Sequence, residues 1–520
     1  MRGRTRLVAA GLATAAMTAA LVPAQVQAAQ VQAAQVQAAQ VQAAEGRPAI
    51  TWTACEGDGF PAETPAETPA EPSLETAPAT APATQCGTID VPLDWAHPDG
   101  RTTTLRVVRL PATDPAHRIG SVLHIPGGPG NSGIEDIKRA AGDLAGIRRR
   151  FDLVAFDPRN TDLAAKLPES CARPAVPDLT EPRDRAAYDV LTRAIAAAIR
   201  ACHAEDRTGL YGRLDSVSVA RDVDAIRAAL GERRLSFMAN SAGGVPAAAY
   251  LRLFPDRVRA MYLDGVIDQT AGWTNQSLLG YRDLQRIFDR FTAWCARTVA
   301  CALHGEDAGK VWRDLTARAD RTPIPVTSQQ FGRGRLTGSH LRWFGFPPDP
   351  GPGDSRWLTF AEAVDKARRG DGSGFAEAAL GNGAVWTMPL IMGMTCGDDR
   401  GYHGYEEYVR VRREARRISP DLGGATFDQL VCAGWPLPVA NPSRPLPVRG
   451  LPPLLGAGTW IDYSLTDSLV RRVPGSTTVR YDGPGHVLYL SGNRCAIGHA
   501  TRYLTDLTLP PPGTVCRPGD

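Results

Sequence analysis

Three separated segments of the sequence combine small residues with side chains suited to nucleophilic catalysis. Ser241 lies in LSFMANSAGG at 235–244, His486 ends GPGH at 483–486, and LHIPGGPG at 123–130 precedes both. A serine hydroxyl becomes a strong nucleophile when a histidine takes its proton and a carboxylate orients that histidine. A glycine turn can present backbone N–H groups to the oxyanion that forms. The three segments therefore predict acyl transfer through Ser241.

The surroundings of Ser241 favour this role over that of an ordinary serine. An apolar run at 235–238 predicts a strand, small residues occupy positions 239 and 243, and an alanine-rich helix is expected to follow. Pro246 falls in the first turn of that helix, where its missing N–H is tolerated. A strand, a sharp turn holding the serine and a helix are typical of the nucleophile turn of α/β-hydrolases.

The remaining catalytic positions are assigned by their order along the chain. His486 follows a predicted strand at 477–481, whereas His124 lies inside an apolar strand and is expected to be structural. Asp462 precedes His486, and the order Ser, Asp, His is that of α/β-hydrolases. Asp467 and Asp264 remain alternatives for the acid.

The oxyanion hole is expected to use two backbone N–H groups. Ala242 follows the nucleophile and supplies the first, and Gly128 in the glycine turn supplies the second. Pro129 has no N–H to donate.

The alternation of predicted elements indicates an α/β fold. Strands are expected at 104–110, 121–125, 151–156, 235–238 and 258–263, with a helix at 218–230. Such alternation favours a mainly parallel sheet flanked by helices. Helical segments at 278–298 and from about 405 to 418 predict a helical cap inserted at 268–438. The hydrolase core then comprises 45–267 and 439–520, with sheet strands at 451–457 and 477–481 and a terminal helix near 497–507.

The N-terminus predicts export. Arg2, Arg4 and Arg6 precede an apolar segment at 7–22, and cleavage is expected near Ala28 or within the AQVQA repeat that follows. Residues 1–44 are thus interpreted as a signal peptide and low-complexity leader. The Pro/Ala/Thr-rich tract at 61–84 is interpreted as a solvated loop. No later apolar stretch is long enough to span a membrane.

The ten cysteines indicate disulfides. Their number is even and no Cys-x-x-Cys pair occurs, which disfavours a metal or redox site. We predict that each cysteine pairs with its neighbour along the chain, giving the pairs 55–86, 171–202, 295–301, 396–432 and 495–516.

The charge balance makes nucleic acid an unexpected partner. The 58 Lys and Arg residues against 55 Asp and Glu residues give a net charge of +3, without a basic run. We expect neither a metal ion nor a cofactor to be required.

Several longer stretches resemble the secreted bacterial tripeptidyl aminopeptidases, which are serine exopeptidases related to proline iminopeptidase. They are GGPGNSG at 127–133, FDLVAFDPR at 151–159, DVDAIRAALG at 222–231, FPDRV at 254–258, LDGV at 263–266, CAGWP at 432–436 and LPPPGTVC at 509–516. The resemblance extends from about Trp52 to Cys516. It implies a triad of Ser241, Asp462 and His486, a C-terminal core segment typical of this family, and release of short N-terminal peptides.

The chain departs from the family pattern at a few positions near the site. Ala239 and Ala242 replace the glycine and tyrosine that usually flank the nucleophile, and Asn160 replaces a glycine. Leu465 and Thr466 stand where Thr-Pro normally follows the acid. Every triad side chain is retained.

A peptidase of this class must neutralise the free α-ammonium group of its substrate. A carboxylate on the cap at a fixed distance from Ser241 would do so. The candidates are Asp398, Asp399, Glu406 and Glu407. Two alternative functions stay open: an esterase or lipase with the same triad, and a non-catalytic binding protein on the same scaffold.

Overall fold

The computed structural model describes residues 49–55, 83–176, 179–381, 385–423 and 427–519. The predicted leader at 1–44 and nearly all of the tract at 61–84 lie outside these residues. The first strand of the described residues begins at Thr51.

Ten strands of the described residues form one sheet. Its order is β1-β2-β3-β5-β4-β6-β7-β10-β11-β12; the pairs from β1 to β5 are antiparallel, and all pairs from β5 to β12 are parallel. The predicted mainly parallel sheet is confirmed. The strands are β1 (Thr51–Ala54), β2 (Gln85–Pro92), β3 (Thr102–Leu110), β4 (Gly120–Ile125), β5 (Phe151–Phe156), β6 (Leu235–Asn240), β7 (Val258–Asp264), β10 (Leu455–Gly458), β11 (Thr477–Tyr481) and β12 (Val515–Cys516).

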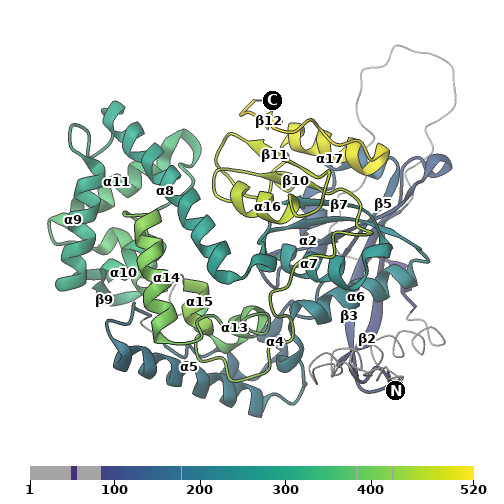
Figure 1. The fold of residues 1–520 in the computed structure, drawn as a ribbon, viewed down its shortest axis with the longest axis horizontal. Helices are drawn as coiled ribbons and strands as arrows, with labels where there is room; N and C mark the ends of the chain where they lie inside the picture. The colour runs from purple at the N-terminus through teal and green to yellow at the C-terminus, as the bar shows by residue number, and fades with distance from the viewer. Residues whose placement is uncertain (1–48, 56–82, 177–178, 382–384, 424–426, 520) are drawn as a thin grey trace, which may run out of the picture. The chain divides into compact units, whose positions relative to one another are not determined.

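Helices cover both faces of the sheet (Figure 1). Helices α6 (Ser216–Ala229), α7 (Gly244–Leu253) and α16 (Tyr463–Val470) share one hydrophobic core with it. Helices α2 (Gly133–Ala140), α3 (Ala145–Arg148) and α17 (Arg494–Asp506) share another. Strands β4, β5 and β6 are buried along their whole length, as expected for strands covered on both sides.

A helical region follows β7, as the cap prediction requires. Helices α8 (Trp273–Arg297), α9 (Ala308–Arg321) and α11 (Ser355–Arg368) pack around aromatic side chains, with a hairpin of β8 (Ile324–Ser328) and β9 (Gly332–Leu336) nearby. Phe291 lies at the centre of this core, with ring centroids of Phe346, Trp357 and Phe360 at 5.0–6.0 Å. Edge-to-face contacts of this kind add to the stabilisation from apolar burial.

A second core on the cap side is built partly from a helix that precedes the nucleophile. Helix α5 (Arg185–Glu205) contributes buried Leu191 and Ile195 to the cluster that also holds residues of α13 (Pro389–Cys396), α14 (Tyr405–Ile418) and α15 (Phe427–Cys432). Figure 1 shows α5 running below α13, α14 and α15.

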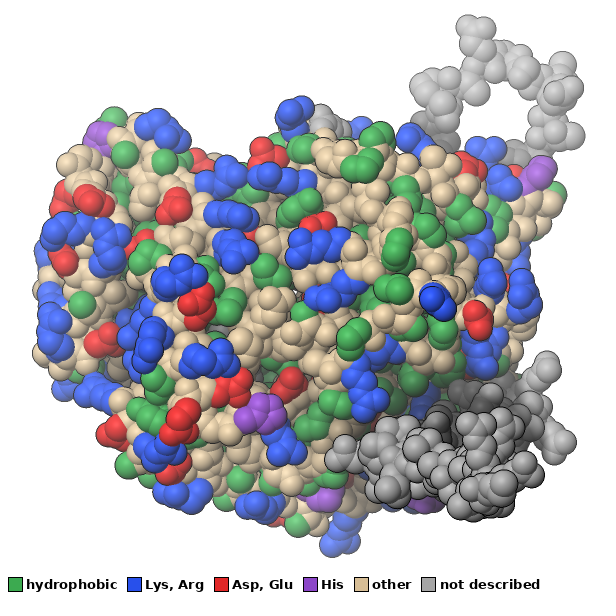
Figure 2. All heavy atoms as spheres, viewed as in Figure 1, with side chains coloured by type: hydrophobic (Ala, Val, Ile, Leu, Met, Phe, Trp, Pro, Cys, Tyr) green, Lys and Arg blue, Asp and Glu red, His purple; other side chains and the backbone are tan. Residues whose placement is uncertain are grey.

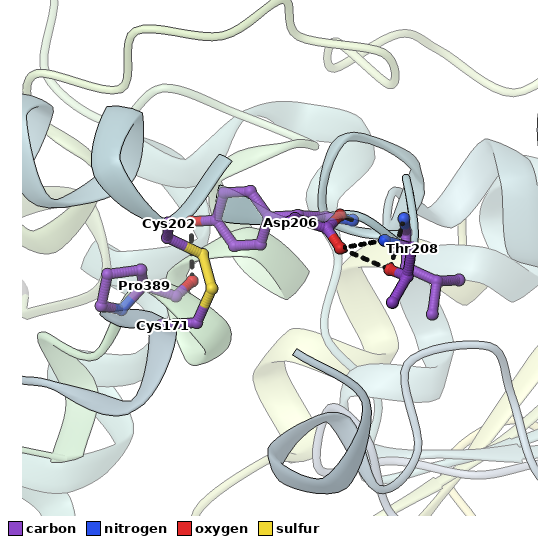
Figure 3. Close-up of a disulfide and its surroundings, with 7 residues drawn as sticks. Cys171, Cys202, Asp206, Thr208 and Pro389 are labelled. Atoms are coloured by element: carbon purple, nitrogen blue, oxygen red, sulfur yellow. Dashed lines mark hydrogen bonds between the residues drawn. A yellow bond between two sulfur atoms is a disulfide. The ribbon is translucent and has the colours of Figure 1, made fainter. Parts of the chain in front are cut away.

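The disulfides are the five predicted neighbour pairs, Cys55–Cys86, Cys171–Cys202, Cys295–Cys301, Cys396–Cys432 and Cys495–Cys516. Cys171–Cys202 ties the end of α5 to the preceding loop (Figure 3). Beside it the Tyr211 hydroxyl donates to the carbonyl of Pro389 at 2.8 Å, which fixes the start of α13. Cys396–Cys432 joins the other end of α13 to α15.

Within the described residues, no helix combines the length and apolar character needed to cross a bilayer. Figure 2 shows blue Lys and Arg side chains dispersed among red and tan ones over the visible face.

Candidate active site

Ser241 occupies a sharp turn between β6 and α7. Its φ is 51°, in the left-handed region that non-glycine residues rarely adopt. The turn packs tightly against the glycine loop after β4, because a Cβ at position 127 would lie 2.6 Å from the Cβ of Ser241. A Cβ at Gly243 would lie 2.6 Å from the carbonyl oxygen of Ile125. The packing of the turn therefore requires glycine at positions 127 and 243.

Asp462 and His486 meet at the carboxyl ends of β10 and β11. His486 Nδ1 lies 2.6 Å from Asp462 Oδ2, and Asp462 is only 3% exposed. The other carboxylate oxygen accepts the backbone N–H of Thr459 at 2.6 Å. The Thr459 hydroxyl in turn donates to the carbonyl of Gly485 at 2.7 Å, next to His486. These bonds hold both partners in place.

The charge around His486 suits a general base that must become an imidazolium. Burial lowers the pKa of His486, but its hydrogen bond with Asp462 and the negative charges of Asp462 and Asp264 outweigh burial and raise the pKa above its ordinary value. The side chain remains about half exposed, at 48%. A substrate can therefore reach the imidazole.

The end of β7 lies next to both the β6 strand that leads to Ser241 and the Asp462–His486 pair. Asp264 pairs in register with Asn240, the residue before Ser241. The next residue, Gly265, has a φ of 60°, and a Cβ there would lie 2.7 Å from Asp462 Oδ2 and 3.1 Å from His486 Nδ1. Strand pairing thus places Gly265, which lies against the Asp462–His486 pair, beside the end of β6 from which Ser241 follows.

A cavity of about 190 Å³ opens beside the predicted oxyanion donors. Gly128 and Ala242 both line it, so the two predicted N–H donors border one space. Trp273 and Trp386 contribute apolar walls, and Met394 from α13 closes another side. The departure from the family pattern at Asn160 also falls in this wall.

Asp398 is the one predicted substrate-binding carboxylate among the residues that line this cavity. It is 2% exposed and accepts the Ser216 backbone N–H at 2.9 Å and the Ser216 hydroxyl at 2.6 Å. Burial, assisted by the negative charge of Asp215, raises the pKa of Asp398 to about 7. A buried carboxylate in a wall of this kind can be neutralised by a cationic ligand.

The other three predicted carboxylates lie elsewhere on the cap. Asp399 accepts the backbone N–H of Gly401 at 3.0 Å. Glu406 is 76% exposed at its side chain and pairs with Arg185. Glu407 accepts the backbone N–H of His403 at 3.0 Å and pairs with Arg410 at 3.3 Å.

The two alternatives for the acid have different places. Asp467 lies on α16, where it pairs with Arg471 at 3.7 Å. Asp264 is completely buried close to the Asp462–His486 pair.

His124, the other histidine considered, is also buried. Its Nδ1 lies 2.9 Å from the Tyr489 hydroxyl and its Nε2 lies 3.2 Å from Asp136. These partners agree with its structural interpretation.

Comparison with known families finds two matching models. The model described as alpha/beta hydrolase fold matches residues 120–337, and the model described as TAP-like protein matches residues 419–516. Together these segments contain Ser241, Asp462 and His486.

Three curated relatives cover most of the chain. Serine protease Hip1 of Mycobacterium tuberculosis is 30% identical, covering 83% of this chain and 87% of that protein. Carboxylesterase B of the same species is 27% identical, covering 84% and 86%. Tripeptidyl aminopeptidase of Streptomyces lividans is 29% identical and covers 71% of each chain.

Proposed function

The chain belongs to the tripeptidyl aminopeptidase family of α/β-hydrolases and is a serine hydrolase, and from this premise we propose that it is an exported aminopeptidase. Its substrates are peptides with a free N-terminus, and the acyl-enzyme forms on Ser241. The observation that carries the peptidase assignment is Asp398, a buried carboxylate in the wall of the cavity that Gly128 and Ala242 also line.

In the proposed reaction the Ser241 hydroxyl attacks the carbonyl carbon of the scissile peptide bond. His486 takes the proton through Nε2, while Asp462 accepts the hydrogen bond from Nδ1–H and stabilises the imidazolium. The backbone N–H groups of Gly128 and Ala242 donate to the developing oxyanion, each contributing about 2.7–4 kcal/mol. His486 then protonates the leaving amine, and water hydrolyses the acyl-enzyme by the same steps.

Asp398 is proposed to bind the α-ammonium group of the substrate. Its two oxygens already accept hydrogen bonds from Ser216, and a carboxylate has about four acceptor positions. A charge-assisted bond in a buried site is roughly twice as strong as a neutral one. An anchor at this position would fix the number of residues between the free N-terminus and Ser241.

The test compares substrates on the wild-type protein and on Ser241→Ala. We expect the wild type to cleave an unblocked tripeptidyl amide and to reject the same peptide with an acetylated N-terminus. Ser241→Ala should lose turnover of the unblocked amide while its thermal unfolding stays close to that of the wild type. Equal rates on blocked and unblocked peptides would refute the aminopeptidase assignment.

The esterase alternative is favoured by one comparison, the relative named Carboxylesterase B. Simple acyl esters should be poorer substrates than the unblocked peptide amide if our proposal holds. Faster turnover of esters together with no cleavage of unblocked peptides would support the esterase instead. Labelling of Ser241 by a fluorophosphonate argues against a non-catalytic binding protein.

Export is proposed on two observations. The first is the basic and apolar N-terminal segment with a cleavage site near Ala28. The second is the presence of five disulfides, which persist in oxidising compartments. N-terminal sequencing of the protein recovered from culture medium would test both export and the cleavage position.

A further inference from the structure

The loop that carries His486 has a strained backbone. Val487 has a φ of 60°, and Gly485 on the other side has a φ of 108°. The left-handed region is unfavourable for a β-branched residue such as valine, and such a conformation persists only where the surroundings enforce it. Some neighbouring group must therefore hold the residues that follow His486.

The backbone N–H groups of Ser491 and Asn493 donate to the carbonyls of Val487 and Leu488. Asp264 is a buried side chain that holds the same loop. Its Oδ2 accepts the backbone N–H of Tyr489 at 3.0 Å and the hydroxyl of Tyr262 at 2.9 Å. The backbone N–H of Leu488 also lies close enough to stabilise the charged carboxylate. Asp264 is 0% exposed, so its carboxylate is fixed inside the sheet and cannot exchange these partners for water.

A second row of buried contacts immobilises the same segment. The Tyr489 hydroxyl lies 2.9 Å from His124 Nδ1, and His124 Nε2 lies 3.2 Å from Asp136 on α2. Tyr489 is thus held at its backbone by Asp264 and at its hydroxyl by His124. These contacts fix the segment that follows His486, while Asp462 holds the imidazole itself.

We propose that Asp264 is a positioning residue that clamps the loop carrying His486 and places a second carboxylate near the imidazole. The proposal rests on the proposed catalytic role of His486. Asp264 is completely buried and bonded to the loop after His486, so it acts on the base and not on the bound peptide.

Asp264 also affects the pKa of His486, which a purely structural residue would not change. Burial, assisted by the charge of Asp462, raises the pKa of Asp264 to about 7, although the N–H groups of Leu488 and Tyr489 and the Tyr262 hydroxyl lower it. The charge of Asp264 in turn raises the pKa of His486. Asp462, Tyr262, Tyr489 and His486 are the groups that share this field, and removing the Asp264 charge must lower the pKa of His486.

The experiment uses Asp264→Asn in the full-length protein, with the unblocked tripeptidyl amide as substrate. We expect kcat to fall roughly tenfold or more, because the imidazole is no longer held in place, while KM stays within twofold. The acid limb of the pH profile of kcat/KM should move to lower pH, because the charge of Asp264 raises the pKa of His486. Unchanged kcat and an unmoved acid limb would overturn the proposal.

Asp268→Asn is the matched control. Asp268 is also 0% exposed; it accepts the Thr270 backbone N–H at 2.9 Å and the Ser468 hydroxyl at 2.6 Å, and it pairs with Arg472 at 3.3 Å. It lies four residues from Asp264 but makes no contact with the loop after His486 in the described structure. Its variant should leave the acid limb in place; an equal shift in both variants would mean that general loss of buried charge is responsible, and would also overturn the proposal.

Two further measurements keep the proposal testable whatever the substrate proves to be. The imidazole titration of His486, followed by NMR in a Ser241→Ala background, should show a lower pKa when Asp264→Asn is added. Hydrogen exchange of the Leu488 and Tyr489 amides should become faster in the same variant.

If the wild type is not labelled at Ser241 by a fluorophosphonate, the proposed function fails, and the role of Asp264 in holding the loop is then judged by these two measurements. If Asp264→Asn does not fold, Tyr262→Phe replaces it, with a smaller acceleration of exchange expected and no acceleration overturning the proposal.

Discussion

Two buried aspartates in different regions both have a raised pKa. Asp264 lies at the end of β7, 0% exposed, and Asp398 lies after α13, 2% exposed. Burial is the main cause in each case, and each pKa rises to about 7. Their surroundings differ: Asp264 binds backbone N–H groups of the loop after His486, whereas Asp398 binds Ser216 and borders a cavity. A raised pKa therefore does not define the role of an aspartate. The role depends on what the carboxylate contacts: the loop after His486 for Asp264, and the cavity for Asp398.

The comparison separates two kinds of kinetic effect. Changes around His486 should lower kcat, because they alter the group that transfers the proton. Changes at Asp398 should raise KM for substrates with a free amine, because they remove a contact with a part of the substrate that does not react. Variants in each region test whether the effects on kcat and on KM separate in this way.

The largest effect is expected from Asp462→Asn. An amide in place of the carboxylate favours the wrong imidazole tautomer and cannot stabilise the imidazolium, so kcat should fall on the order of 10⁴-fold with little change in KM. Steady-state kinetics on the unblocked tripeptidyl amide would measure both constants. Asp467→Asn is the control and should retain activity, since Asp467 pairs with Arg471 at the surface of α16. The opposite ranking of these two variants would assign the acid to Asp467.

Gly265→Ala should have the next largest effect. The added methyl group would lie 2.7 Å from Asp462 Oδ2 and 3.1 Å from His486 Nδ1, and the φ of 60° disfavours any side chain. Displacing the pair by about 1 Å can reduce kcat roughly 100-fold. Gly280→Ala is a matched control, because a Cβ there meets nothing within 4 Å. Equal activity of the two variants would show that the pair tolerates displacement.

Order and local pattern in the sequence were enough to predict most of the sheet and the pairing of Asp462 with His486. Strands such as 151–156 are short and apolar, so their residue pattern predicts them without knowledge of the tertiary structure. The sequence indicates Asp264 only as an alternative acid, because its contacts depend on strand pairing and on the loop after His486. The Asp264-Gly265 dipeptide was the available signal, since glycine after a strand indicates a close backbone approach.

Helix α5 was not predicted, although its buried residues Tyr188, Leu191, Ile195 and Ile199 have helical spacing. Its partners lie about 200 residues later, in α13 and α14. The choice among Asp398, Asp399, Glu406 and Glu407 could not be made from the sequence for the same reason. Adjacent carboxylates such as Asp398 and Asp399 differ only in what the tertiary fold places around them.

Asp398→Asn should act on KM rather than on kcat. The loss of a charge-assisted hydrogen bond of about 1.5–3 kcal/mol corresponds to a rise in KM of roughly 10- to 150-fold for unblocked peptides. Substrates without an amine, such as a simple acyl ester, serve as the internal control and should be unaffected. A fall in kcat on both substrate classes would place Asp398 with the groups that support the reaction instead.

The pH dependence of KM also tests whether the charge of Asp398 binds the ammonium group. Because the pKa of Asp398 is raised to about 7, its carboxylate becomes neutral as the pH falls below 7 and loses its attraction for the ammonium group. The peptide amine loses its own proton above a pH of about 8. KM for unblocked peptides should therefore be lowest between about 7 and 8 and rise severalfold toward pH 6. In Asp398→Asn the rise on the acid side should vanish, and its persistence would assign it to another group.

The smallest effect is expected from Glu406→Gln, which tests whether any carboxylate on the cap can serve as the anchor. The Glu406 side chain is 76% exposed and pairs with Arg185, and it does not line the cavity that contains Asp398. Solvent screens an exposed charge of this kind, so its removal should leave KM for the unblocked tripeptidyl amide within twofold of the wild type. The same substrate and buffer as for Asp398→Asn make the two values directly comparable. A rise in KM equal to that of Asp398→Asn would mean that the peptide binds over the cap surface, and the distinction between the two buried aspartates would then lose its functional meaning.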